Sequence, residues 1–219
     1  MKKNKISLII NIIIVVLVVI GCIFMFTGFK FMPSDNKLEV SNIEMFKFYT
    51  VDSNIFMAIV SMMYVFFQFK LNKKAINEIP IYVYILKFVG TSAIFLTFIT
   101  TAFFLTPQYG LYAMYNNNNL LFHLIVPILS IVSYVFFDKY NNKYRDALFG
   151  IIPMSIYSIF YTSNVLLHLK DNKVSYDYDF YGFLQGDLNN IFLAIPIVFF
   201  SAYLISILLV FLNKKLIDD

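Results

Sequence analysis

The sequence predicts an all-α, polytopic membrane protein with six transmembrane helices in one bundle. Of its 219 residues, 60% are hydrophobic and 14% are charged, whereas a soluble domain is roughly 45–50% apolar and about 25% charged. The apolar residues also gather in six runs, each near the roughly 20 residues that a helix needs to cross a bilayer. We therefore expect residues 1–219 to form a single six-helix transmembrane domain, multi-pass in the cell membrane.

The six runs follow one another along the chain. We expect helices at residues 6–29, 48–69, 81–105, 118–137, 147–168 and 189–212. Pro80 precedes the third run and Pro107 follows it. The connections are short except for residues 30–47 and 169–188.

The first run begins after three lysines, as a signal peptide does. It continues as apolar sequence past Cys22 and is longer than the usual apolar core of a signal peptide, so we expect a retained first helix. Because Cys22 is the only cysteine, neither a disulfide framework nor a cluster of metal-binding thiolates is expected.

Positive charge predicts the orientation of the bundle. The N-terminus, the second and fourth connections and the C-terminal tail lie on one side and carry eleven basic residues: Lys2, Lys3, Lys5, Lys70, Lys73, Lys74, Lys139, Lys143, Arg145, Lys214 and Lys215. The other side carries five: Lys30, Lys37, Lys47, Lys170 and Lys173. The positive-inside rule therefore predicts that both termini are cytoplasmic.

The start of the second run is unusually polar for a membrane helix and contains Thr50, Asp52, Ser53 and Asn54. At helical spacing, Thr50, Ser53 and Asn54 share one face, whereas Asp52 lies about 200° around the helix from Thr50. Capping of free backbone N–H groups is one role for such residues. With the orientation above, the cluster lies at the outer end of the second helix.

Polar residues also form stripes on other runs. In the fourth run the stripe contains Asn116, Asn119, His123, Ser130 and Tyr134. In the fifth it contains Pro153, Tyr157, Tyr161, Asn164 and His168, and in the third Lys87, Thr91, Thr97 and Thr101. Pro127 follows His123 by four residues, so it frees the His123 carbonyl from its helical partner. Polar stripes on several spans predict a shared internal cavity, open to the outside.

Thr50 and His123 are the residue types that nucleophilic acyl transfer requires. A threonine hydroxyl is a weak nucleophile until a neighbouring imidazole takes its proton. Free N–H groups at the start of the second helix would stabilise an oxyanion beside Thr50. We therefore expect Thr50 and His123 to be the catalytic residues. The residues expected to bind or orient a substrate are Asp52, Ser53, Asn54, Asn119, Tyr161 and Asn164.

The chain resembles the six-span bacterial relatives of the androgen-induced and androgen-dependent membrane proteins. The resemblance rests on Phe48, Tyr49, Thr50, Ser53 and Asn54 in the second run, His123 and Pro127 in the fourth, and the sequence Tyr181-Gly182-Phe183-Leu184. It implies an intramembrane threonine hydrolase of fatty-acid esters of hydroxy fatty acids, with Thr50 and His123 at the essential positions and an aromatic lid before the sixth helix. Asp52 departs from the neutral residue expected there.

Other functions are compatible with the sequence. Asp52, His123 and His168 are candidates for the relay of a small transporter or ion-coupled carrier, and a non-catalytic membrane scaffold is a further alternative. A metal or haem site on the two histidines is disfavoured, because metal sites usually use three to four ligands. We expect no metal or other cofactor.

The expected partners are the lipid bilayer and an acyl-ester substrate. Nucleic acid is not expected, because the basic clusters are short flanks of spans.

Overall fold

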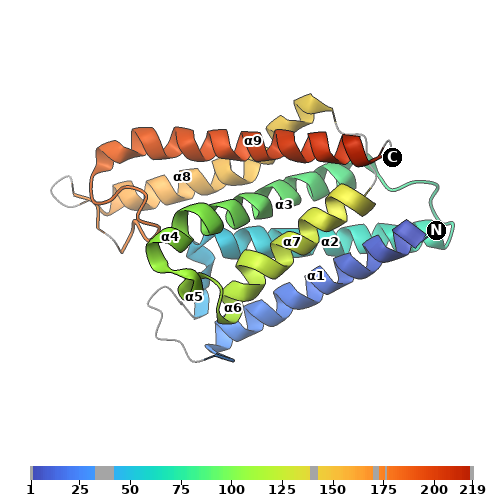
Figure 1. The fold of residues 1–219 in the computed structure, drawn as a ribbon, viewed down its shortest axis with the longest axis horizontal. Coiled ribbons are helices and arrows are strands. Elements are labelled where there is room, and N and C mark those ends of the chain that lie inside the picture. The colour runs from blue at the N-terminus through green and yellow to red at the C-terminus, as the bar shows by residue number, and fades with distance from the viewer. Residues whose placement is uncertain (1, 33–41, 139–142, 170–172, 176, 218–219) are drawn as a thin grey trace.

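The computed structural model describes residues 2–32, 42–138, 143–169, 173–175 and 177–217. Lys37, Lys139 and Lys170, which contribute to the predicted orientation, lie outside these residues. The described part is all-α and contains six helices long and apolar enough to cross a membrane (Figure 1). These spans are Asn4–Thr27, Tyr49–Asn72, Ile81–Tyr109, Asn117–Phe137, Tyr144–Leu167 and Leu188–Leu216. The predicted fold class, a multi-pass helical membrane protein, is therefore confirmed.

The first two spans are continuous helices, whereas the later spans change helical type along their length. The first half of the chain forms α1 (Lys2–Thr27), the 3₁₀ helix η1 (Asn42–Lys47), α2 (Tyr49–Asn72), α3 (Ile81–Thr100), the π-helical turn η2 (Thr101–Leu105), α4 (Thr106–Tyr109) and α5 (Leu111–Met114). The fourth span combines α6 (Asn117–Leu120), the π-helical η3 (Leu121–Ile125), α7 (Val126–Val132) and the π-helical η4 (Ser133–Phe137). The last two spans combine the 3₁₀ helix η5 (Tyr144–Ile151) with α8 (Ile152–Leu167), and the 3₁₀ helix η6 (Leu188–Asn190) with α9 (Ile191–Ile217).

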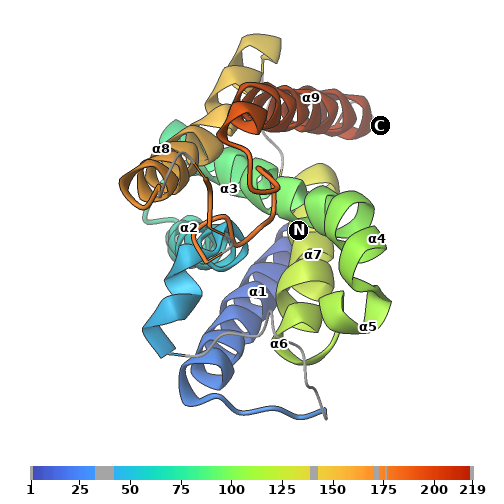
Figure 2. The ribbon, with the colours of Figure 1, turned by 90° about the vertical axis from the view of Figure 1, so that its left-hand side faces the viewer.

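Helix α3 is the centre of the bundle. It packs against α2, α7, α9 and η5, while α1 packs against α2 and α7 on the far side (Figures 1 and 2). Gly150 permits the contact of η5 with α3 and α9, because a Cβ atom there would lie 2.0 Å from the Ser206 hydroxyl and 2.8 Å from the Ser92 hydroxyl. Small residues at such contacts let helices in a membrane approach closely. Helix α8 lies at the edge and packs mainly against α9, η5 and α3.

A buried polar cluster joins α1 to the rest of the bundle. Lys87 of α3 and Asp138, just after η4, are both almost fully buried, and their charged groups lie 3.7 Å apart. The Lys87 ammonium also donates hydrogen bonds to Asn11 and Ser61. Ser7 donates to the other Asp138 carboxylate oxygen over 2.6 Å. An intramembrane charge is costly unless it is paired in this way, so the cluster favours one arrangement of α1, α3 and η4.

Candidate functional site

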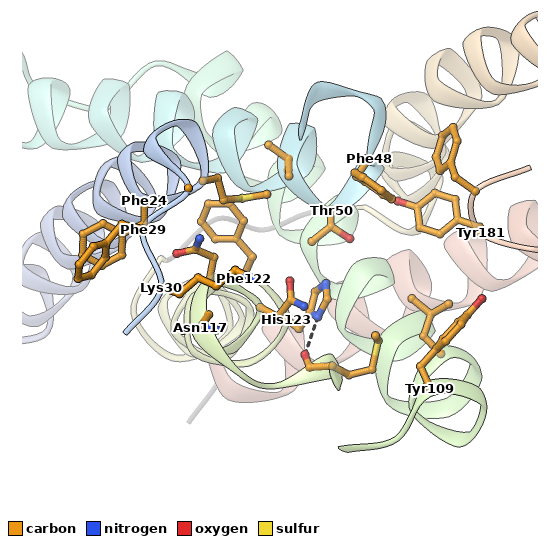
Figure 3. A pocket seen from close by; sticks show the side chains of 18 residues that line it. Phe24, Phe29, Lys30, Phe48, Thr50, Tyr109, Asn117, Phe122, His123 and Tyr181 are labelled. Carbon is orange, nitrogen blue, oxygen red and sulfur yellow. Dashed lines mark hydrogen bonds between the residues drawn. The ribbon is translucent and has the colours of Figure 1, made fainter. Parts of the chain in front are cut away.

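A cavity of about 240 Å³ lies among the end of α1, the start of α2 and the fourth span (Figure 3). Its walls are largely aromatic and apolar, with amides and one lysine added at one side. The lining residues are Phe24, Met25, Gly28, Phe29, Lys30, Phe48, Thr50, Val51, Leu105, Tyr109, Met114, Asn117, Asn118, Asn119, Phe122, His123, Phe180 and Tyr181. The structure thus places Thr50 and His123, from two different spans, on the wall of one cavity.

Thr50 is the second residue of α2 and is partly buried. The N-cap position before the helix is Phe48, which makes no side-chain capping bond. The polar residues of this turn therefore have roles other than the N-cap role that the sequence left open. No hydrogen bond between described residues joins Thr50 directly to His123; both side chains line the shared cavity (Figure 3).

The contact of His123 with the backbone determines its tautomer. The Nδ1 atom of His123 lies 2.8 Å from the carbonyl oxygen of Met114 (Figure 3). A carbonyl oxygen only accepts hydrogen bonds, so Nδ1 carries the proton in the neutral ring and Nε2 keeps its lone pair. Nε2 makes no hydrogen bond with a described residue. The ring is therefore oriented by its backbone contact and has a free basic nitrogen.

Asn54 fixes the relative positions of the two candidate catalytic residues. Its side-chain amide nitrogen donates to the carbonyl oxygen of Thr50 over 2.8 Å and to that of Phe122 over 3.1 Å. In the π-helical turn η3, the carbonyl of Phe122 would bond to the N–H of residue 127, but Pro127 has none. Pro127 therefore frees the carbonyl of Phe122 for a tertiary contact, and not the carbonyl of His123 that α-helical spacing predicts.

Ser53 and Asp52 lie away from the cavity lining. The Ser53 hydroxyl is buried between α2 and α3, 3.0 Å from both the Thr50 carbonyl oxygen and the Thr97 hydroxyl. Asp52 lines a separate groove on the other side of α2, in agreement with its expected rotation from Thr50. Ser53 therefore supports the helix that carries Thr50, whereas Asp52 is not positioned to orient a substrate in the Thr50 cavity.

Asn119 lines the cavity and donates a hydrogen bond to the carbonyl oxygen of Ala113 over 3.0 Å. Two neighbouring amides, which the sequence reasoning did not select, line it as well. Asn117 bonds to both the N–H and the carbonyl of Met32, at 2.7 and 3.1 Å, and so ties the segment after α1 to the fourth span. The run of four asparagines at 116–119 is the sequence feature that could have indicated them, whereas helical spacing alone selects only Asn116 and Asn119.

Tyr161 and Asn164 belong to a neighbouring part of the structure. Tyr161 donates a hydrogen bond to the buried carboxylate of Asp179 and packs among the aromatic rings of residues 180–183. The carbonyl of Asn164 accepts a bond from His168, which stacks on Tyr178 with ring centroids 3.8 Å apart. Neither Tyr161 nor Asn164 lines the Thr50 cavity.

The structure does not bring together the three residues considered as the relay of a carrier, since Asp52, His123 and His168 lie in three different places.

The connection before the sixth span covers the Thr50 end of the cavity. Phe180 and Tyr181 line the cavity wall. Asp179 holds this segment in place by accepting hydrogen bonds from the N–H groups of Leu184 and Gln185, at 2.9 and 3.1 Å. Tyr176, in the same connection, lies outside the described residues. The segment occupies the position expected for an aromatic lid.

Tyr181 contacts the start of α2 directly. Burial raises the pKa of the Tyr181 phenol to about 12, and hydrogen bonding with the Thr50 and Tyr157 side chains and with the backbone of Thr50 and Tyr49 limits the increase. Backbone N–H groups at a helix N-terminus are free to bind an oxygen. The hydroxyl oxygen of Tyr181 therefore lies against the start of α2, beside Thr50.

Within the described part of the chain, no three or more His, Cys, Asp or Glu side chains form a group that could hold a metal ion. Comparison with known proteins adds no assignment: no family model, curated protein or solved structure matches the chain.

Proposed function

We propose that this protein is an intramembrane hydrolase of lipid-like acyl esters, with Thr50 as nucleophile and His123 as base. The observation that carries the proposal is that both residues line one cavity, with Nε2 of His123 free to take a proton. The resemblance of the second and fourth spans to intramembrane threonine hydrolases supports the same assignment. We further propose that the site lies near the outer face of the cell membrane, with both termini in the cytoplasm.

The proposed reaction has two steps. First, Thr50 Oγ1 attacks the ester carbonyl carbon while Nε2 of His123 takes the hydroxyl proton; the tetrahedral oxyanion then collapses, and the leaving alkoxide takes that proton from His123. This step forms an acyl-threonine and releases an alcohol. Second, a water molecule attacks the acyl-threonine with His123 as base, which releases the carboxylic acid and restores the Thr50 hydroxyl.

The start of α2 would stabilise the oxyanion. The N–H groups of Tyr49 and Thr50 are among the first of the helix, where no intrahelical acceptor is available, and the positive end of the helix dipole lies there. The Tyr181 hydroxyl interacts with these groups. A substrate carbonyl oxygen would take its place or lie beside it, and the protonated phenol would then be a further donor.

The walls of the cavity favour an amphiphilic substrate. Phe24, Phe29, Phe48 and Phe122 offer an apolar surface for an acyl chain, while the amides at 117–119 offer polar contacts for the leaving group. An acyl ester combines these two properties. The membrane-spanning position of the helices would let such a substrate enter from the bilayer.

Hydrolysis of long-chain esters by the purified full-length protein tests this function. Wild type should turn over the ester, Thr50→Val should be inactive because it keeps the shape without the hydroxyl, and Thr50→Ser should retain some turnover. Thr162→Val, at a threonine outside the Thr50 cavity, is the matched control and should remain active. Undiminished turnover by folded Thr50→Val would refute the nucleophile assignment, and a wild type inert to all esters would favour a carrier or scaffold.

The proposed orientation has an independent test. In a Cys22→Ser background, a membrane-impermeant thiol reagent added to intact cells should label Glu44→Cys, before α2, and not Asn72→Cys, at its other end. Both positions are exposed in the structure. The reverse labelling pattern would place the Thr50 cavity on the cytoplasmic side.

A further inference from the structure

A second hollow lies on the opposite side of α2 from the Thr50 cavity. It is a groove of about 480 Å³ between α2, α3 and the fifth span. Helix α2 lines it with Tyr49, Asp52, Ser53 and Phe56, whose spacing of three, one and three places them on one helical stripe. Thr50 is not among its lining residues, so the groove is a separate surface from the proposed catalytic cavity.

The groove has the length and lining of a site for a hydrocarbon chain. Its other lining residues are Ile85, Leu86, Val89, Phe149, Ile152, Pro153, Ile156, Tyr157 and Phe160. Asp52 and Phe160 lie towards the Thr50 end of their spans, whereas Phe149 and Ile85 lie towards the other end. The groove therefore runs along the bundle. Because α2 and α8 are not packed closely together, it is accessible to lipid from the side.

Asp52 supplies the only formal charge on the groove lining, among the residues that the structure describes. Its carboxylate makes no ion pair and accepts no hydrogen bond from a described residue. The hydroxyl of Tyr49, which is 8% exposed, is also buried without a hydrogen-bond partner. The neighbouring Ser53 hydroxyl is already bonded to Thr97. The Asp52 carboxylate is thus the unsatisfied polar group that the groove offers to a ligand.

An isolated carboxylate beside hydrocarbon is unfavourable, and a ligand that brings a cation removes this cost. A primary ammonium is a suitable cation, because it donates short, charge-assisted hydrogen bonds to a carboxylate. A lipid with an anionic head group would instead meet the like charge of Asp52.

We propose that this groove is a binding site for phosphatidylethanolamine, with one acyl chain along α2, α3 and α8 and the head-group ammonium on Asp52. The site takes its lipid from the leaflet at the Thr50 end of the bundle. It is independent of the proposed hydrolysis, since none of its contacts requires Thr50 or His123 to be catalytic.

Native mass spectrometry of the detergent-purified full-length protein tests the head-group contact. Phosphatidylethanolamine and phosphatidylglycerol with identical chains are added at equal concentration, and wild type is expected to bind the former at least about fivefold more tightly. Asp52→Asn keeps the shape of the side chain and should reduce the preference to below about twofold. Asp177→Asn, at an exposed carboxylate outside the groove, should leave the preference unchanged.

A second pair of variants tests the acyl-chain contact. Ile156→Trp should fill the groove and reduce phosphatidylethanolamine binding, whereas Ile159→Trp, on the same helix but outside the groove, should not. Equal binding of the two lipids by wild type, or an unchanged preference in Asp52→Asn, would overturn the proposal. So would a dimer of this chain that Ile156→Trp disrupts and phosphatidylethanolamine does not affect, because the groove would then be a protein interface.

Discussion

The side-chain amide of Asn54 donates a hydrogen bond to the carbonyl oxygen of Phe122, 3.1 Å away. This contact joins α2, one turn after Thr50, to η3 at the residue before His123. The same amide nitrogen also bonds to the Thr50 carbonyl. Asn54 is therefore a positioning residue: it does not line the Thr50 cavity, but it determines how Thr50 and His123 face each other.

We expect Asn54→Leu to lower stability by about 1–3 kcal/mol, because it leaves the buried Phe122 carbonyl without a partner. It should also reduce ester turnover through kcat more than through KM, since the catalytic geometry changes while the cavity walls remain. Asn164→Leu is the control, because the structure assigns its side chain no hydrogen bond. Thermal unfolding and steady-state kinetics measure both effects. Unchanged kcat in a destabilised Asn54→Leu protein would limit Asn54 to a structural role.

The sequence predicts the spans well because hydropathy and length determine them. The expected second helix at 48–69 is observed as Tyr49–Asn72, and the fourth at 118–137 as Asn117–Phe137. The rotation of Asp52 away from Thr50 also follows from helical periodicity. These features depend on residues within a single helix.

Contacts between helices could not be obtained in this way. Tyr161 shares a stripe with residues of the fifth span, yet its partner is Asp179 in the following connection. The cluster around Lys87 requires Asn11 on the first span and Asp138 just after the fourth, which are distant in the sequence and meet only through the packing of the spans. The partner of Asn54 depends on the π-helical turn η3, which shifts the free carbonyl by one residue.

We expect Lys87→Met to be strongly destabilising, by about 3–5 kcal/mol, because it leaves the buried Asp138 carboxylate without its cation. The double variant Lys87→Met with Asp138→Asn should cost less than the sum of the two single changes. Lys47→Met removes an exposed pair with Glu44 and should cost only about 0–1 kcal/mol. Thermal unfolding in detergent compares the two single variants, the double variant and the Lys47→Met control with wild type. Additive single effects would show that Lys87 and Asp138 do not act as a pair.

Tyr181 should give the protein a specific pH dependence at alkaline pH. Its pKa is raised from 10.0 to about 12 in the folded protein, so between these values the unfolded chain binds fewer protons than the folded one. Stability from this group is therefore complete below pH 10 and falls as the pH rises towards 12, by up to about 1.4 kcal/mol per pH unit.

We expect Tyr181→Phe to unfold with a shallower dependence of Tm on pH over this range than wild type. Tyr82→Phe, at an exposed tyrosine, is the control. The difference between each variant and wild type isolates one phenol from the other tyrosines. Identical slopes for wild type and Tyr181→Phe would contradict the burial of the Tyr181 hydroxyl against the start of α2.

Covalent labelling with a lipid-like fluorophosphonate tests the central claim most directly. The Thr50 oxygen should attack phosphorus and displace fluoride while His123 takes the proton, and mass spectrometry should then find the added phosphonyl group on the peptide that contains Thr50. Thr50→Ser should remain reactive, and His123→Ala should abolish labelling. A wild-type protein that is labelled at another residue, or labelling that is equal in folded Thr50→Val, would contradict the assignment of Thr50 as the nucleophile.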